Sequence, residues 1–304
     1  MKNEFLPEGE YIKVLKRGYD IGCESIMCGT ALMCDKKMNL YVDIGGGRGI
    51  IPQSEIAYCE DGAYPKDIAV ITRVGKPVSF VVIGEEGGYP VLSRREAQKR
   101  CWEERLSQLV PGDIIPAEVT HLEPFGAFLD IGCGYPALMS VDAISVSRIS
   151  HPRDRLSVGD RIMCVVRSVD KINRRIFVSQ RELYGTWEEN AAMFCAGQTV
   201  RGIIRSVESY GVFVELMPNL AGLCEVRPEL LGGISPEGRF ASVYIKSIIP
   251  GRMKVKLVLI ELLEKCTSPV ATEYFVDCDS TEHMDYWQYS PSGAPKLVMT
   301  DFTL

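Results

Sequence analysis

Short runs of apolar residues separated by turn residues follow one another through the middle of the chain. They cover residues 114–119, 125–131, 136–139, 161–169 and 175–179. Glycine, asparagine and aspartate stand between them, which is typical of β-strands joined by turns. Five short strands in so small a module predict a closed barrel of the oligonucleotide- and oligosaccharide-binding (OB) type, because closure removes exposed sheet edges.

One pattern recurs along the chain. Gly112 lies thirteen residues before the sequence Phe-Gly-Ala-Phe at 125–128, and Gly197 lies thirteen residues before Tyr-Gly-Val-Phe at 210–213. The two copies are offset by 85 residues. A weaker copy at 38–45, offset by 87 residues from the middle one, keeps the strand and lacks the Phe-Gly pair. A repeat of this length indicates whole domains rather than the turns of a solenoid.

We therefore predict an all-β protein of three tandem five-stranded OB barrels joined by short helical linkers. The predicted domains are 20–96 (a degenerate barrel), 110–184 (the copy with the most complete pattern), 195–265 (a third barrel) and 266–304 (an acidic C-terminal hairpin extension).

The segments between the barrels have helix-forming composition. Residues 93–106 combine good helix formers with mixed charge, and Ser93 is either the helix cap or the end of the preceding strand. Residues 179–187 are predicted to take the same form. Trp102 and Trp187 each lie ten residues before a repeat glycine. We expect these rings to anchor the linkers on the barrels rather than to stack on bases.

Composition narrows the class of protein. The chain of 304 residues is 46% hydrophobic and 24% charged, without an apolar run of the roughly 20 residues that would cross a membrane. Residues 1–16 carry three glutamates and lack the apolar core of a secretory signal, so a cytoplasmic location is expected. The eleven cysteines form no Cys-x-x-Cys pair. This absence argues against a disulfide framework and a zinc site.

Other candidate chemistry is weak. The three histidines are far apart, so neither a metal site nor a cofactor is expected. His121 lies just before Phe125 and could touch a ligand, but an ordinary loop histidine is the favoured interpretation. The glycine-rich stretch 45–49 is not followed by Lys-Ser/Thr, and it therefore predicts a hairpin turn rather than a phosphate-binding loop.

Charge is unevenly distributed. The net charge is -6 and the pI near 5.3, which alone would count against a nucleic-acid partner. Residues 148–181, however, hold nine basic and three acidic residues, a local +6, whereas 266–304 have a local -5. A charge run by itself favours a solvated face. The acidic tail favours packing on the last barrel or on a protein partner.

The aromatic turn suggests a binding surface. Residues i and i+3 of a regular strand face opposite sides, so Phe125 and Phe128 can share a face only if Gly126 allows a bulge or a sharp bend. A Phe-x-x-Phe pair in a β-rich segment more often belongs to the core. Beside an arginine-rich return strand, though, exposed rings suit single-stranded nucleic acid, whose bases stack while arginines hold phosphates.

The residues at 112–183 resemble the RNA-binding domain family named after ribosomal protein S-one. The strand Gly-Asp-Ile-Ile-Pro-Ala-Glu-Val at 112–119, the Phe-Gly-Ala-Phe turn, and the sequence Asp-Lys-Ile-Asn-Arg-Arg-Ile-Phe-Val-Ser at 170–179 carry the match. The resemblance implies an RNA face made by Phe125, Phe128, Asp170 and one or both of Arg174 and Arg175. Ser140 stands where the family often has histidine.

The last copy keeps Tyr210 and Phe213, and Arg252 and Lys254 stand on its basic return strand. The resemblance implies weaker RNA binding there, because Glu225 occupies the histidine position and should repel phosphate. The first copy is expected not to stack bases.

The multi-repeat layout resembles the bacterial small-subunit ribosomal S-one family. It implies a non-enzymatic, single-stranded RNA- or mRNA-binding role in translation, with the small ribosomal subunit bound through the first domain. Three alternatives stay open: a nuclease or its accessory subunit, an accessory factor of RNA decay or transcription, and a protein-interaction scaffold.

Overall fold

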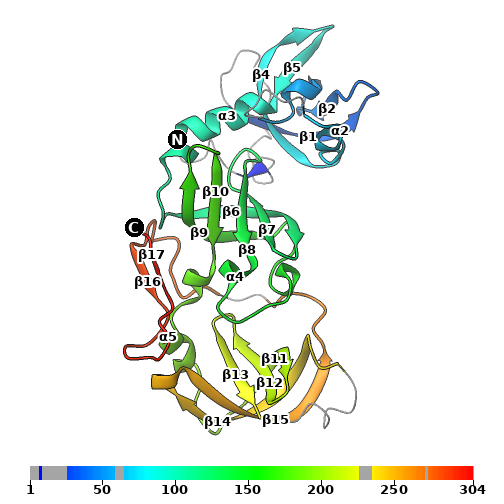
Figure 1. The fold of residues 1–304 in the computed structure, drawn as a ribbon. Coiled ribbons are helices and arrows are strands. Elements are labelled where there is room, and N and C mark those ends of the chain that lie inside the picture. Colours follow the sequence, from blue (N-terminus) through cyan, green and yellow to red (C-terminus); the bar gives the residue numbers. More distant parts are fainter. Residues whose placement is uncertain (1–6, 9–25, 59–64, 226–234, 271–272, 304) are drawn as a thin grey trace.

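The protein is described here from a computed structural model that covers residues 7–8, 26–58, 65–225, 235–270 and 273–303. Three small β-barrels follow one another in sequence order, the first at the top of Figure 1 and the third at the bottom. Residues 20–25 of the predicted first domain lie outside the described residues. The all-β class and the three five-stranded barrels are confirmed.

The strands are grouped by barrel. The first barrel contains β1 (Met27–Cys34), β2 (Leu40–Asp43), β3 (Arg48–Ile51), β4 (Pro77–Glu86) and β5 (Tyr89–Ser93). The middle barrel contains β6 (Ile114–Glu123), β7 (Gly126–Asp130), β8 (Pro136–Ser140), β9 (Arg161–Asp170) and β10 (Arg175–Ser179). The last barrel contains β11 (Thr199–Glu208), β12 (Gly211–Met217), β13 (Leu220–Cys224), β14 (Arg239–Ile249) and β15 (Lys254–Lys265).

All three barrels close in the same way. The first strand pairs antiparallel with the second and the fourth, and the third runs parallel to the fifth. The hairpin turn predicted at 45–49 joins the antiparallel strands β2 and β3. Alternation fills each interior: in β15, Val255 and Leu257 are buried, while Lys254 and Lys256 are exposed.

Short helical segments connect and cover the barrels. The α-helices are α2 (Asp67–Ile71), α3 (Arg94–Glu104), α4 (Val141–Ile144) and α5 (Trp187–Ala192). The 3-10 turns are η1 (Gln53–Glu55), η2 (Leu106–Gln108), η3 (Pro152–Asp154), η4 (Arg181–Tyr184) and η6 (Pro250–Arg252).

Helix α3 links the first and middle barrels, as predicted. Ser93 is both the last residue of β5 and the helix cap, because its hydroxyl accepts from the Glu96 N–H at 2.9 Å. Trp102 is 5% exposed and stacks on Tyr135 of the middle barrel, with ring centroids 5.4 Å apart. The expected anchoring role of this ring agrees with its burial.

The second linker differs from the expectation that it would repeat the first. Residues 181–184 form only a 3-10 turn, and Gly185 then has φ +75°, a left-handed conformation that ends it. A new helix begins at Trp187, where Thr186 and Glu189 form a capping box. Trp187 is 2% exposed and anchors this helix in the core of the last barrel.

The C-terminal segment contains the antiparallel strands β16 (Tyr286–Gln288) and β17 (Met299–Asp301). It does not pack on the last barrel alone. Trp287 and Tyr289 join the core of the last barrel, whereas Phe302 packs against Ile114 and other residues of the middle barrel. The segment therefore runs beside both barrels, as Figure 1 shows for β16 and β17.

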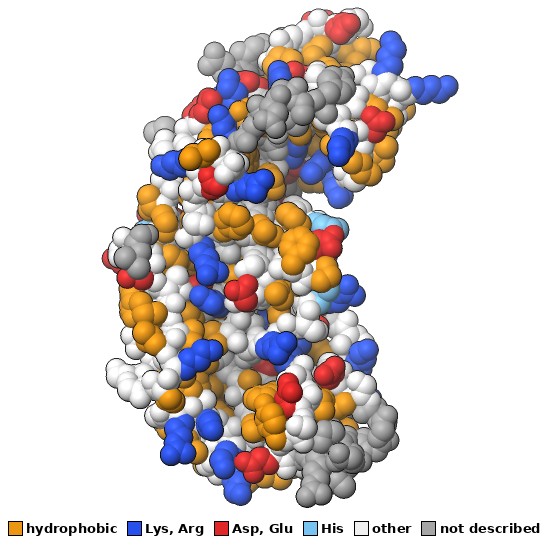
Figure 2. All heavy atoms as spheres, viewed as in Figure 1, with side chains coloured by type: hydrophobic (Ala, Val, Ile, Leu, Met, Phe, Trp, Pro, Cys, Tyr) orange, Lys and Arg blue, Asp and Glu red, His pale blue; other side chains and the backbone are white. Residues whose placement is uncertain are grey.

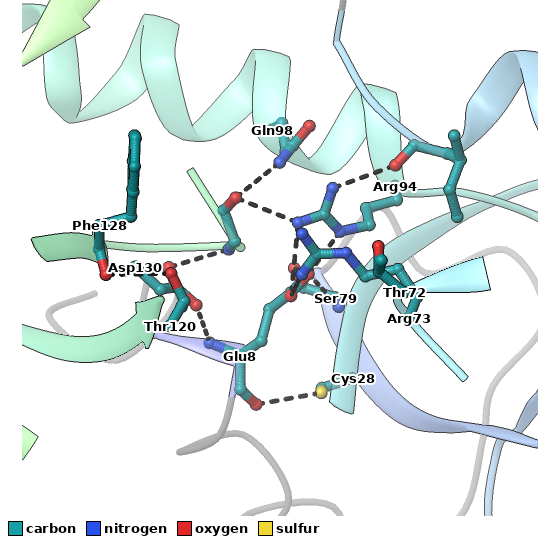
Figure 3. Close-up of polar contacts among 12 residues, drawn as sticks. Glu8, Cys28, Thr72, Arg73, Ser79, Arg94, Gln98, Thr120, Phe128 and Asp130 are labelled. Carbon is teal, nitrogen blue, oxygen red and sulfur yellow. Dashed lines mark hydrogen bonds and ion pairs between the residues drawn. The ribbon is translucent and has the colours of Figure 1, made fainter. Parts of the chain in front are cut away.

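A buried ionic cluster lies between the first and middle barrels (Figure 3). Glu8 accepts from Arg94 Nε at 2.7 Å and from both the N–H and the hydroxyl of Ser79 at 3.0 Å. Its own N–H donates to Asp130 of β7 at 2.6 Å. Burial and the neighbouring Glu8 raise the pKa of Asp130 to about 7. Arg94 also donates to the Gly134 carbonyl, so the cluster ties the barrels together.

A second buried cluster joins the middle and last barrels. Arg155 donates from both terminal nitrogens to the two oxygens of Glu215, each at 2.8 Å. Arg205 donates to the same carboxylate from Nε at 2.8 Å. The side chain of Arg155 is 3% exposed, that of Glu215 is 5% exposed and that of Arg205 is 8% exposed. One carboxylate thus balances two arginines inside this interface.

Candidate nucleic-acid interface

Two phenylalanine rings form a surface on the middle barrel, which we call the ring platform (Phe125 and Phe128). Phe125 occupies the turn between β6 and β7 and is 56% exposed, and Phe128 follows in β7. Their centroids are 6.0 Å apart and their planes meet at 89°. Both rings therefore lie on one side of the barrel, one beside the other.

The turn itself, rather than a bulge at Gly126, brings the rings together. The ladder between β7 and β8 is regular from Gly126 to Asp130, and the irregularity lies in β6, between Val119 and His121. A Cβ atom at Gly126 would stand 2.4 Å from the Met139 carbonyl oxygen. Glycine is needed here because the β8 backbone approaches so closely.

His121 belongs to this surface, although an ordinary loop histidine was favoured from the sequence. It lies in β6, directly opposite Phe128 in the ladder, and the two ring centroids are 6.3 Å apart. Its side chain is 62% exposed and pairs with Glu123 at 2.7 Å. The irregular register of β6 positions this ring, and sequence spacing alone does not reveal such a register.

Asp170 shapes the turn between β9 and β10. Its carboxylate accepts from the N–H groups of Ile172 and Asn173 at 3.1 and 2.9 Å, and from the Asn173 side chain at 2.7 Å. These hydrogen bonds, the Asn173 side chain foremost, lower the pKa of Asp170. The carboxylate is thus engaged in holding the turn from which the two arginines project.

The two arginines of this turn differ. Arg174 has φ +48°, and its guanidinium lies 4.7 Å from the Tyr58 ring centroid and 5.9 Å from that of Trp102. Arg175, the first residue of β10, is exposed. Arg174 is held between aromatic rings, and Arg175 points to solvent.

The basic segment at 148–181 does not form one face. Arg155 is buried against Glu215, Arg174 lies on Tyr58, and Arg181 pairs with Glu182 at 3.2 Å. The local charge of +6 therefore overstates the number of cations that lie beside the ring platform.

Comparisons with known proteins identify this module. Residues 109–181 match the family model of the S1 RNA binding domain. A small ribosomal subunit protein bS1 of Leuconostoc lactis is 29% identical over 74% of this chain and 54% of its own length. A bS1 homolog of Bacillus cereus is 30% identical over 84% of this chain and 64% of its own length. The chain is similar to bacterial bS1 proteins over most of its length, and its middle barrel matches the S1 RNA binding domain.

Two further facts bound this relationship. The chain spans 54% and 64% of the length of these two bS1 relatives. A solved multidomain protein with nucleic acid binding domains from Streptococcus pneumoniae aligns over 80% of this chain and 76% of its own, at 15% identity and a TM-score of 0.26.

The last barrel repeats the ring geometry of the S1 domain. Tyr210 is 61% exposed, its centroid lies 6.3 Å from that of Phe213, and the ring planes meet at 88°. A Cβ atom at Gly211 would lie 2.4 Å from the Cys224 carbonyl oxygen, the same distance as between a Cβ atom at Gly126 and the Met139 carbonyl oxygen. Two sequences offset by 85 residues thus build the same surface.

The return turn of the last barrel departs from the S1 domain. Met253 has φ +49° and occupies the left-handed position that Arg174 holds in the middle barrel. Arg252 and Lys254 on either side of it are exposed. Glu225, in the place of the family histidine, pairs with Lys256 at 3.5 Å. One cation is therefore partly neutralised, and the turn carries no stacked arginine.

At the two equivalent positions, both within the described residues, the first barrel has no matching ring pair. By the offset of 87 residues, Met38 and Tyr41 stand where Phe125 and Phe128 stand in the S1 domain. Both side chains are only partly exposed.

Within the described parts of the chain, no helix has the length and apolar character needed to cross a membrane. Among the same residues, no group of three or more His, Cys, Asp or Glu side chains is placed to hold a metal ion.

Proposed function

We propose that this protein binds single-stranded RNA in the translation apparatus, without catalysing a reaction. The middle barrel supplies the principal site through Phe125, Phe128, Arg174 and Arg175, with Asp170 holding the turn. The last barrel supplies a weaker site through Tyr210, Phe213, Arg252 and Lys254. The S1 RNA binding domain match at 109–181 and the similarity to bS1 proteins support the RNA-binding role.

The observation that carries this proposal is the exposed ring pair built twice. Phe125 and Tyr210 are 56% and 61% exposed, although burial of such a ring is favourable. A ring that served only the core would be buried. Bases stack on exposed rings with little regard to sequence, and an adjacent cation such as Arg175 suits the phosphates.

We assign the remaining parts accordingly. Domain 20–96 is the degenerate barrel that contacts the small ribosomal subunit, and domains 110–184 and 195–265 hold RNA. The extension 266–304 packs against the middle and last barrels and stabilises their arrangement. Leu32, Met33 and Ile83 of the first barrel are 41%, 50% and 50% exposed, which favours a protein contact there. We place this function in the cytoplasm.

The first test is direct binding. Fluorescence anisotropy with labelled oligo(U) of roughly 12 nucleotides, within the usual range of OB site sizes, should show saturable binding that a duplex of the same length does not. Two or three phosphate contacts predict that log K falls with log salt at a slope of about -1.5 to -2. A slope near zero would exclude phosphate contacts, and absence of binding would refute the proposal.

Two further measurements separate the alternatives. A nuclease would shorten end-labelled RNA during incubation with the purified protein, and we expect intact RNA. Co-sedimentation with small ribosomal subunits, with and without prior nuclease treatment, tests the translation role. A protein-interaction scaffold, in contrast, would be purified from cells with no RNA bound to it.

The charge at Glu225 predicts a gain of function in the last barrel. We expect Glu225→Gln to raise RNA affinity by about 2- to 5-fold at low salt, because it removes a repulsion comparable to an exposed ion pair. The measurement uses a Phe125→Ala/Phe128→Ala background, in which the last barrel dominates. Glu264→Gln, a change of the same kind near the C-terminal end of β15, is the control. Equal gains from both variants would mean that only net charge matters.

A further inference from the structure

A groove of about 460 Å³ lies between the first and middle barrels. It begins at Phe128 of the ring platform and is lined by β8, β10 and two residues from outside the middle barrel, Tyr58 and Gln98. Its volume falls within the range of about 300–1,000 Å³ that is typical of small-ligand sites, which often lie between domains. Figure 2 shows hydrophobic and basic side chains together on the face of the middle barrel that lies below the first barrel.

Tyr58 is held in place by hydrogen bonds that cross the barrel interface. Its N–H donates to Gln98 Oε1 at 3.0 Å, and Gln98 Nε2 donates to the Gly134 carbonyl at 2.9 Å. Gln98 is 4% exposed, and Figure 3 shows it reaching from α3 toward the middle barrel. Because both the oxygen and the nitrogen of this buried amide are hydrogen-bonded, it holds the Tyr58 backbone at a fixed place beside the middle barrel.

The side chains around Tyr58 form an ordered stack. The Arg174 guanidinium lies 4.7 Å from the centroid of Tyr58 and 5.9 Å from that of Trp102, and Trp102 in turn stacks on Tyr135. The Tyr135 hydroxyl donates to the Arg174 carbonyl at 2.8 Å. The groove wall therefore combines an aromatic ring of one barrel with a fixed cation of the next.

We propose that this groove holds the nucleotide of single-stranded RNA that follows those stacked on the ring platform, and that Tyr58 of the first barrel contacts it. The inference rests on the proposed function. The groove offers apolar walls at Pro136 and Leu138 for a base or ribose, and Arg174 and Arg175 for its phosphate. The bound strand thus leaves the platform toward the first barrel, and the two barrels bind RNA as one unit.

The experiment compares tyrosine variants in the full chain. Tyr58→Ala should weaken oligo(U) binding by about 5-fold or more, the loss typical of one stacked ring, whereas Tyr58→Phe keeps wild-type affinity. The matched control is Tyr89→Ala, because Tyr89 is a 46% exposed tyrosine of the same barrel that does not line the groove. Its affinity should equal that of the wild type.

A second readout uses the unaltered protein. Oligo(U) containing 4-thiouridine is crosslinked by light, and the attached peptide is identified by mass spectrometry. We expect attachment at Tyr58 as well as at the platform. This measurement decides the matter even if Tyr58→Ala loosens the barrel interface.

The outcomes separate the two proposals. If Phe125→Ala/Phe128→Ala loses affinity while Tyr58→Ala does not, and no crosslink forms at Tyr58, the groove is not part of the site and the proposed function stands. If the wild type binds no RNA, both fall.

Discussion

Replacing Phe125 and Phe128 together with alanine is expected to lower the affinity for single-stranded RNA by at least about 30-fold. Each base stacked on an aromatic ring contributes about 1–3 kcal/mol, and about 1.4 kcal/mol corresponds to a factor of ten. The two rings of the platform therefore account for roughly 2 kcal/mol or more. Anisotropy titrations with labelled oligo(U) measure the change.

The fold should survive this double substitution. Phe125 is 56% exposed and neither ring belongs to the buried core cluster of the middle barrel. We expect thermal unfolding of the variant to stay close to that of the wild type. A large fall in melting temperature would show that the rings stabilise the barrel. The loss of RNA affinity would then be measured with the single variants Phe125→Ala and Phe128→Ala.

Two control variants show whether the loss of RNA affinity is specific to the ring platform. Tyr210→Ala/Phe213→Ala removes the equivalent rings of the last barrel and should cost less, because Glu225 and Met253 weaken that site. Tyr286→Ala removes a 46% exposed ring from the acidic C-terminal segment and should leave binding unchanged. Equal affinities of the platform variant and the wild type would refute the proposed site.

Local patterns predicted much of this molecule. The five apolar runs of the middle copy correspond to β6–β10, since each strand is bounded by residues that favour turns. Burial of Trp102 and Trp187 followed from their repeated place before the barrels. These features depend on neighbours along the chain, which a sequence displays directly.

Features that depend on contacts between distant segments were missed. The position of His121 opposite Phe128 depends on the register of β6, and the stacking of Arg174 on Tyr58 depends on how two barrels meet. In the sequence, Arg174 and Arg175 are adjacent and nothing distinguishes their roles. Only the left-handed turn and the aromatic wall of another domain separate their roles.

The interface between the middle and last barrels carries the largest expected effect on stability. Replacing Glu215 with glutamine should lower the free energy of unfolding of this part of the chain by about 3–5 kcal/mol, because it leaves Arg155 and Arg205 buried with no carboxylate to balance their charge. Glutamine keeps the size of the side chain, so the change isolates the charge. Denaturant titration followed by tryptophan fluorescence reports the loss, since Trp187 lies in the core of the last barrel.

An exposed pair in the same barrel provides the control. Arg201 and Glu264 form an ion pair whose side chains are 52% and 66% exposed. Water screens such a pair, so Glu264→Gln should cost about 1 kcal/mol or less. Similar losses from the two variants would mean that burial does not distinguish the pairs and that Glu215 is not the centre of the interface.

The pH dependence gives an independent check on Glu215. Burial alone would raise its pKa, but Arg155 and then Arg205 hold the pKa below the ordinary value of 4.5. A carboxyl with a lowered folded-state pKa contributes stability that is present above 4.5 and is lost as the pH falls through the folded-state pKa. The stability difference between wild type and Glu215→Gln should therefore be largest near neutral pH and shrink in acid. A difference that stays constant down to pH values well below 4.5 would show that the carboxylate charge is not what stabilises this interface.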